Sequence, residues 1–223
     1  MGSNKKLRIG ALMLTTAGFL QSFSGQAATS IEAKNTEFTA ANATQALQVK
    51  AQSWYNPTMG YTGWTHHSRW GYMKLQKGKS VTITVETDVA GFHPALTVWF
   101  RPQKKGLASV NQMNSHSYNQ FNNIYEANAV NTDDAANPIK IGKIQMEFIA
   151  NAFDRDGMGD TLPEEFDQSM LNRVLDGKPG TVSLTFTPKV SGVYQFVVGG
   201  INPDVGVSPT AFHPVNVTVS FPE

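Results

Sequence analysis

The sequence contains no cysteine, so it cannot form a disulfide, use a thiolate metal ligand or carry a lipid on a cysteine. It also lacks an apolar run of the roughly 20 residues that a transmembrane helix needs. Only 16% of its 223 residues are charged, and the formal net charge is +1. These absences argue against a disulfide-stabilised fold, a helical membrane protein and a nucleic-acid-binding protein. The fold must therefore depend on its hydrophobic core, for which the chain is long enough.

The first 28 residues have the pattern of a secretory signal peptide. Three basic residues precede an apolar run at residues 9–20, and small residues follow up to Ala28. The run is too short to span a bilayer. We therefore predict a signal peptide at residues 1–28, one domain at residues 29–223 and an exported product in the periplasm, on the outer cell surface or secreted. Removing the signal takes away three of the 18 basic residues and none of the 17 acidic ones, which leaves a slightly negative protein.

Alternation of apolar and polar residues predicts a fold that is mainly β. The alternating segments are residues 81–85, 95–100, 143–153, 182–186, 193–198 and 215–221. Turn residues separate them, at positions 77–79, 188–192 and 199–203. A period of two indicates half-buried strands, and short turns between them are typical of antiparallel pairing. The sequence therefore predicts a single antiparallel β-sandwich domain with long loops and one short helix.

The helix is predicted to begin at Thr161. Thr161 and Glu164 form a capping box, and apolar residues then recur at helical spacing up to Val174, before a stop at Gly177. A long loop is predicted at residues 111–138, which are rich in Asn, Gln and Ser and show no sustained periodicity. Loops of this length in compact domains are usually functional.

Two of the five histidines and two of the four tryptophans lie within residues 64–70. Imidazole is the commonest metal ligand in proteins, and neighbouring aromatic rings exclude water from a bound ion. On an extended segment Trp64 and His66 share one face, whereas His67 points to the other. His116, in the long polar loop, is a candidate second ligand. Metal binding is the favoured interpretation, and aromatic packing is the alternative.

The remaining histidines occur in a short repeated pattern. His93 and His213 each lie between a phenylalanine and a proline, just before an alternating segment. Proline fixes φ and favours an extended residue before it, so a local role at the start of a strand is the favoured interpretation. A second metal site is the alternative. Met113, three residues before His116, is either a gap-filling apolar side chain or a soft metal ligand.

The group formed by Trp64, His66 and His116 resembles the copper site of a family of surface proteins from methane-oxidising bacteria, the CorA and MopE type. The resemblance implies Cu(I) held by two histidines and by a tryptophan oxidised to kynurenine, two residues before the first histidine. Trp64-Thr-His66 matches that pattern, and His116 is the natural second histidine. Placement of the pattern on His67 and Trp70 is the alternative. The resemblance implies copper acquisition or storage without catalysis, with other cell-surface or copper-handling proteins as candidate partners.

A second group of candidate ligands resembles an EF-hand calcium loop. With Asp154 at position 1, Asp156 falls at position 3, Gly159 at the sharp turn of position 6 and Glu165 at the bidentate position 12. Asp160 adds a further carboxylate. Position 5 lacks an oxygen ligand, and the preceding segment alternates as a strand, so we predict a Ca²⁺ loop between a strand and a helix. The resemblance to the CorA type implies calcium as well as copper.

Two other functions fit the sequence less well. The common motifs of hydrolases, zinc peptidases and nucleotide-binding enzymes do not occur, so the enzymatic alternative is a copper oxidase that uses His66, His67 and His116. The other alternative is a calcium-stabilised glycan-binding module, similar to domains that follow secreted peptidases. In that alternative Trp64 and Trp70 would form a stacking platform.

Overall fold

The computed structural model describes residues 35–56, 61–64, 68–102, 124–131, 139–159, 169–201 and 207–222. These residues form thirteen strands and no helix, and they belong to one compact unit that begins at Ala33. No described helix is therefore long and apolar enough to cross a membrane. The predicted signal peptide lies outside the described residues.

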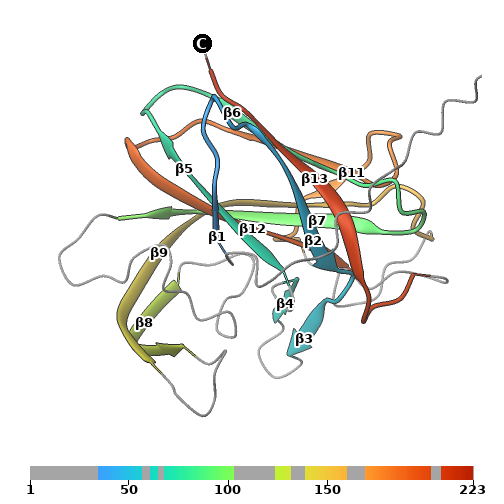
Figure 1. Ribbon diagram of the computed structural model, residues 1–223, viewed down its shortest axis with the longest axis horizontal. Coiled ribbons are helices and arrows are strands. Elements are labelled where there is room, and N and C mark those ends of the chain that lie inside the picture. The colour runs from blue at the N-terminus through green and yellow to red at the C-terminus, as the bar shows by residue number, and fades with distance from the viewer. Residues whose placement is uncertain are drawn as a thin grey trace, which may run out of the picture. The chain divides into compact units, whose positions relative to one another are not determined.

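The larger of two packed sheets has seven strands (Figure 1). Six of them follow in the order β1 (Asn35–Glu37), β5 (Arg69–Leu75), β12 (Gly192–Ile201), β7 (His93–Arg101), β9 (Ile139–Asp154) and β10 (Arg173–Val174). The seventh, β8 (Ile124–Asn131), pairs with β9. The central pairs are antiparallel, whereas β1 with β5 and β10 with β9 are parallel, which departs from the purely antiparallel prediction.

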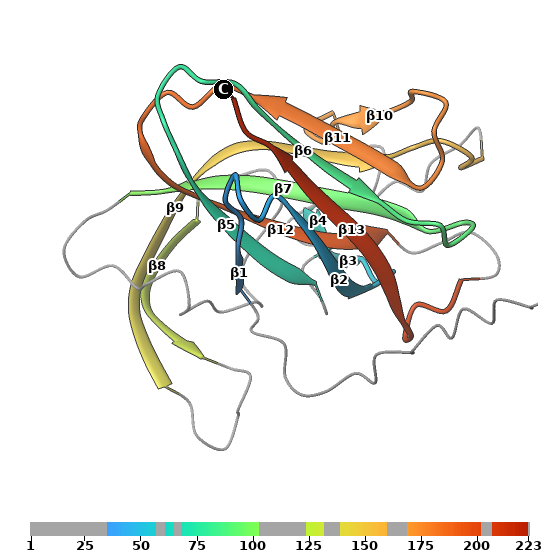
Figure 2. The ribbon, with the colours of Figure 1, turned by 45° about the horizontal axis from the view of Figure 1, so that its top comes forward.

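The smaller sheet has four antiparallel strands. Their order is β11 (Thr181–Phe186), β6 (Val81–Glu86), β13 (Phe212–Ser220) and β2 (Thr44–Lys50). Figure 2 shows these four strands as one layer that crosses over the larger sheet. A separate pair, β3 (Trp54–Asn56) and β4 (Tyr61–Gly63), leads toward β5. The predicted β-sandwich is confirmed.

The interior between the sheets follows from the alternation in the sequence. On β6, Val81, Ile83 and Val85 are buried. Thr82 and Thr84, between them, are partly exposed on the outer face. The other strands of the smaller sheet contribute buried aliphatic and aromatic residues in the same way, and these pack against the inner face of the larger sheet. Burial of these side chains is the main stabilising contribution to the sandwich.

The opposite face of the larger sheet is buried too. On β12, Phe196 and Val198 face the interior, whereas Val197 and Ile201 belong to a second apolar cluster. We call this second cluster the outer cluster; its buried members are Trp64, Trp70, Ala95, Trp99, Met146, Phe153, Leu171, Val197 and Ile201. A central strand with both faces buried needs apolar residues on both, and β12 is accordingly buried without interruption from Tyr194 onward.

Two predicted irregular segments are strands instead. Part of the predicted loop at residues 111–138 forms β8, paired antiparallel with the first half of β9. Gly199 and Gly200, which we predicted to begin a turn, lie within β12 and pair with Ala95 and Pro94 of β7. Glycine in a strand marks a close approach of neighbouring groups, and this is what the structure shows at both positions.

The predicted helix is wrong over its described part. Residues 169–172 form turns and irregular structure, and they lead into β10 alongside the end of β9. The backbone groups of these residues bond to the side chain of Asn151 and not to a helical turn. Asn151 Nδ2 donates to the carbonyl of Met170 (3.1 Å), and its Oδ1 accepts from the amide of Asn172 (2.9 Å). Residues 160–168, which include the predicted capping box, lie outside the described residues.

Substitutions at two adjacent residues of β6 test this assignment of faces. Ile83→Ala leaves a cavity between the sheets and should lower the free energy of unfolding by about 2–5 kcal/mol. Thr84→Ala, on the outer face, should cost less than about 1 kcal/mol, including its 3.0 Å contact with the Ser183 hydroxyl. Urea denaturation measures both, and equal losses would contradict the assignment.

Candidate metal centre

Trp64 is the predicted copper ligand that lies within the described residues. It directly follows β4, precedes β5 and belongs to the outer cluster, with none of its surface exposed. Among the described residues its indole Nε1 has no hydrogen-bond partner. A buried N–H without a partner costs about 1–3 kcal/mol. Within the described part of the chain, this N–H is therefore a buried polar group that still needs a partner.

Aromatic and aliphatic side chains surround Trp64. The ring of Phe153 lies 6.5 Å from that of Trp64, tilted by 52°, and Trp70 packs on Trp99 at 5.6 Å. The buried members of the cluster are all apolar, so they exclude water and lower the local dielectric. Trp70 is only 4% exposed. An open stacking platform made of Trp64 and Trp70, as the glycan-binding alternative requires, is therefore wrong.

The other predicted copper ligands lie outside the described residues. His66 and the alternative ligand His67 fall between Trp64 and Ser68, where the description of the chain resumes one residue before β5. His116 and Met113 fall within residues 103–123, which are also outside it. The assignment of His66 and His116 therefore stays a prediction. Burial of Trp64 beside this segment is consistent with a site that is closed to water on one side.

The residues that hold Trp64 are not evident from the sequence pattern. Phe153 is recognisable only as part of an alternating segment, and Gly199 is indistinguishable from a turn glycine. In the structure Gly199 lies directly against the backbone carbonyl of Trp64. The signal available in the sequence is a pair of glycines that continues an apolar strand, which indicates close packing on both faces.

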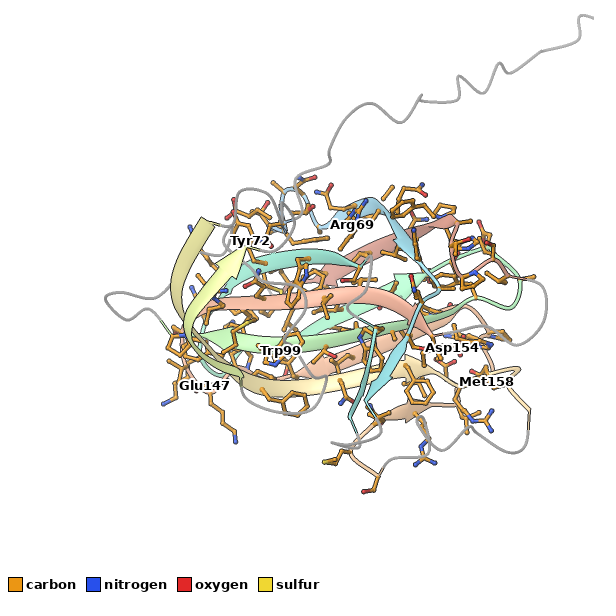
Figure 3. All side chains as sticks on the ribbon, turned by 90° about the horizontal axis from the view of Figure 1, so that it is seen from below. Arg69, Tyr72, Trp99, Glu147, Asp154 and Met158 are labelled. Atoms are coloured by element: carbon orange, nitrogen blue, oxygen red, sulfur yellow. The ribbon has the colours of Figure 1, made fainter. Side chains whose placement is uncertain are left out.

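Asp154, the last residue of β9, is fully buried at one end of the sheet (Figure 3). Its Oδ1 accepts a hydrogen bond from the amide of Asp156 (2.9 Å), and its Oδ2 accepts one from the amide of Gly180 (2.7 Å). His93 Nδ1 lies 3.4 Å from the same Oδ2 and has no hydrogen-bond partner among the described residues. The carboxylate of Asp154 thus joins the end of β9 to the turn before β11, and this is a structural role.

Asp156 also accepts hydrogen bonds from a distant turn. Its Oδ2 accepts from the amides of Asp176 (3.0 Å) and Lys178 (3.1 Å). Burial alone raises the pKa of this carboxyl, but hydrogen bonds from Asp176, Lys178 and Gly177 outweigh burial and hold the pKa below its ordinary value. Asp156 is therefore held in its charged form at neutral pH.

The described part of the acidic loop departs from an EF-hand. The left-handed turn is at Gly157, with φ of 76°, and not at Gly159 as the EF-hand count predicts. The guanidinium of Arg155 donates to the carbonyls of Met158 (2.8 Å) and Gly159 (2.5 Å). A cationic side chain thus binds the carbonyls on one side of the loop. Figure 3 shows Met158 near Asp154, at the end of the sandwich opposite Glu147.

His93 and His213 both have local contacts. His93 begins β7 beside Asp154, and His213 is the second residue of β13. His213 Nε2 lies 2.8 Å from the carbonyl of Ser208, and its ring packs against Phe92 at 5.5 Å. These contacts support the local interpretation. Within the described residues, no three histidine, aspartate or glutamate side chains are close enough to hold a metal ion together.

Comparison with known proteins identifies the family. The family described as "Copper(I)-binding protein CorA-like" matches residues 26–208, which is most of the chain. The chain belongs to the CorA-like copper(I)-binding family. The resemblance proposed from Trp64, His66 and His116 is therefore confirmed at the level of the family. A comparison with curated proteins gave no significant match.

Two solved structures agree with this membership in the CorA-like family. The chain is 52% identical to CorA of Methylomicrobium album BG8, described as a surface-associated copper-binding protein important in copper acquisition. That match covers 84% of this chain and 98% of the other, with a TM-score of 0.74. The secreted protein MopE of Methylococcus capsulatus is 17% identical and matches with a TM-score of 0.53 over 83% of this chain and 87% of its own. The likeness to MopE shows a shared fold.

The structural role of Asp154 can be separated from any role in calcium binding. Asp154→Ala should lower the free energy of unfolding by about 3 kcal/mol in protein treated with a chelator, because two buried amides lose a charged acceptor. Asp176→Ala is the matched control, since its carboxylate is exposed and accepts a hydrogen bond from the amide of Lys178 at 3.1 Å, and it should cost less than about 1 kcal/mol. A loss at Asp154 that appears only when Ca²⁺ is present would contradict the structural role.

Proposed function

We propose that this protein is exported and binds Cu(I) for acquisition or storage, with Trp64, His66 and His116 as the ligands. Membership in the CorA-like copper(I)-binding family supports copper as the cargo. The burial of Trp64 with an unpartnered indole N–H supports the position of the site. The surface-associated CorA and the secreted MopE support export of this chain through the signal peptide predicted at residues 1–28.

The proposed ligand set suits the chemistry of Cu(I). This ion has a filled d shell and accepts two or three nitrogen or sulfur ligands, so two imidazoles suffice when water and competing ligands are excluded. A chain without cysteine has no thiolate to offer. The apolar outer cluster around Trp64 provides the dry surroundings on the described side of the site. The Nε1 of Trp64 is buried and has no hydrogen-bond partner among the described residues.

Oxidation of Trp64 is part of this proposal. MopE is described as a protein in which an oxidised tryptophan facilitates copper binding. Dioxygen would cleave the C2–C3 bond of the Trp64 indole to give N-formylkynurenine, and hydrolysis would release formate and leave an aromatic amine and a ketone beside the metal. An amine nitrogen is a better donor to Cu(I) than an indole N–H, which has no free lone pair. Peptide mass spectrometry of native protein would reveal a mass change confined to the peptide that contains Trp64.

Single substitutions of histidine test the copper ligands. His66→Ala and His116→Ala should each lower Cu(I) affinity by about 100-fold or more in a chelator competition, because no cysteine can replace the lost nitrogen. His213→Ala is the matched control and should leave the affinity unchanged, since His213 Nε2 contacts the carbonyl of Ser208. Wild-type affinity in both His66→Ala and His116→Ala, with loss in His67→Ala, would assign the site to His67 and Trp70 instead.

The same histidine variants also test whether the copper site is catalytic. We propose that the copper site does not turn over substrate, in keeping with copper as cargo. A copper oxidase formed by His66, His67 and His116 would consume oxygen when a reductant is added to the copper-loaded protein. Oxygen consumption above that of the His66→Ala variant, continuing over many turnovers, would favour the oxidase.

We also propose that Asp154, Asp156, Asp160 and Glu165 bind Ca²⁺. A carboxylate oxygen can accept an amide hydrogen bond and still coordinate a cation, so the hydrogen bonds of Asp154 and Asp156 are compatible with binding. The pKa of Asp156, held below its ordinary value, keeps that ligand charged. The contacts of Arg155 with the loop carbonyls restrict the ion to the carboxylate side.

Addition of Ca²⁺ to chelator-treated protein tests this second site. Binding to the folded state should raise the melting temperature by mass action and slow proteolysis within the loop. Asp160→Asn and Glu165→Gln should abolish the rise while leaving the melting temperature of chelator-treated protein unchanged. An unchanged melting temperature and unchanged proteolysis in the wild type would show that the loop does not bind Ca²⁺.

A further inference from the structure

We propose that Gly199, Ala95 and Phe153 form a notch in the outer face of the larger sheet that fixes the position of Trp64, and through it the affinity for copper. The inference about position stands on contacts between described residues. The inference about affinity rests on the proposed function of Trp64 in copper binding. Gly199 is thus a positioning residue, and it does not touch the metal.

The notch follows from the register of three strands. Gly199 of β12 pairs with Ala95 of β7, and Ala95 pairs in turn with Phe153 of β9. Along this row the side chains are a hydrogen atom, a methyl group and an aromatic ring. Ala95 and Phe153 are buried members of the outer cluster, so the row faces the side on which Trp64 lies. Two small residues beside a large one leave a recess bounded by the ring of Phe153.

Trp64 fills this recess. Its ring packs against Phe153 with centroids 6.5 Å apart, and no part of its surface is exposed. A Cβ atom at Gly199 would collide with the carbonyl oxygen of Trp64 and lie 3.1 Å from the Trp64 Cβ. The carbonyl is part of the backbone and cannot rotate away as the end of a flexible side chain can. A methyl group at Gly199 must therefore displace the backbone of Trp64.

Glycine is required at position 199 for space and not for backbone conformation. Gly199 is absent from the glycines with positive φ, so alanine can adopt its backbone angles without strain. Gly200, its neighbour on β12, is crowded on the opposite face. A Cβ there would lie 2.5 Å from the Phe92 ring and 3.0 Å from the Cα of Ala51, both of which belong to the interior between the sheets. The two glycines therefore form a matched pair of sites for substitution.

The displacement would pass to the copper ligands through the chain. The carbonyl carbon of Trp64 is bonded to the nitrogen of residue 65, and His66 is the next residue. Peptide units are planar and rigid, so a shift of this carbonyl shifts the start of the segment that carries His66. Functional groups held about 1 Å from their productive positions commonly lose a large part of their effect.

The test compares Gly199→Ala with Gly200→Ala in the full-length exported protein. Both substitutions should lower the melting temperature, because both overpack β12. Only Gly199→Ala should lower Cu(I) affinity, by about 10-fold or more in a chelator competition, in the range seen when groups that orient ligands are changed. Gly200→Ala should stay within about 2-fold of the wild type. Equal affinities in the two folded variants would overturn the proposal.

A spectroscopic measurement on the metal-free protein reports the position of Trp64 directly. The near-ultraviolet circular dichroism of Trp64, obtained by subtraction of the Trp64→Phe spectrum, should change in Gly199→Ala and remain in Gly200→Ala. An unchanged Trp64 signal in Gly199→Ala would overturn the notch while leaving the copper assignment intact. The other outcome is a changed Trp64 signal in Gly199→Ala together with wild-type copper affinity in His66→Ala and His116→Ala. That outcome would support the notch but overturn the proposed function, and with it the proposed effect of the position of Trp64 on copper affinity.

A second variant keeps the test decisive if Gly199→Ala fails to fold. Phe153→Leu removes the aromatic ring that bounds the notch but keeps an apolar side chain at position 153. It should alter the Trp64 signal and weaken Cu(I) binding, with a smaller loss of melting temperature than a truncation to alanine. Val217→Ala is the control, because the side chain of Val217 on β13 is buried in the core between the two sheets and is not part of the outer cluster. Equal copper affinity in Phe153→Leu and Val217→Ala would overturn the notch.

Discussion

Burial of β12 and β7 on both faces is the constraint on which the rest of this structure depends. The inner face of these strands packs against the four-stranded sheet, and the outer face packs under the tryptophans. Two polar side chains buried on these strands find partners there: Arg101 donates to Gln195 (3.0 Å), and Gln195 donates to Asn35 of β1 (3.1 Å). A sheet held from both sides in this way is a rigid base for whatever lies on its outer face.

The proposed ligands lie at two places on this base. Trp64 lies on the outer face of the central strands, whereas Asp154 and Asp156 lie where β9 ends and contact the turn before β11. The first place is apolar and dry, which suits a soft ion, and the second is a set of carboxylates and backbone amides, which suits a hard one. One sandwich thus provides two environments of opposite chemical character, each anchored to a strand of the larger sheet.

The sequence predicts strands in both sheets, including parts of β7 and β12, but it misses β2 and β5. Residues 81–85 and 215–221 alternate because one face of the smaller sheet is wet, and both were predictable. β5 carries Trp70 and Met73 on its two buried faces, so it shows no alternation. One partner of Asp154 is the backbone amide of Gly180, far away in the chain, and no pattern of side chains in the sequence indicates this contact. Trp64 was recognisable as a candidate ligand from its neighbours in sequence. Its packing against Gly199, in contrast, depends on strand register.

The strand order of the smaller sheet also governs when this fold can be completed. β13 follows every other described strand in the chain, yet it lies between β6 and β2 and is hydrogen-bonded to both. β2 and β6 therefore cannot join into one sheet until residues 212–220 are available, and their pairing spans most of the chain. Such long-range closure is slow, because the entropy of ordering the intervening chain must be lost first. The smaller sheet can therefore be completed only once the last described strand of the chain is present.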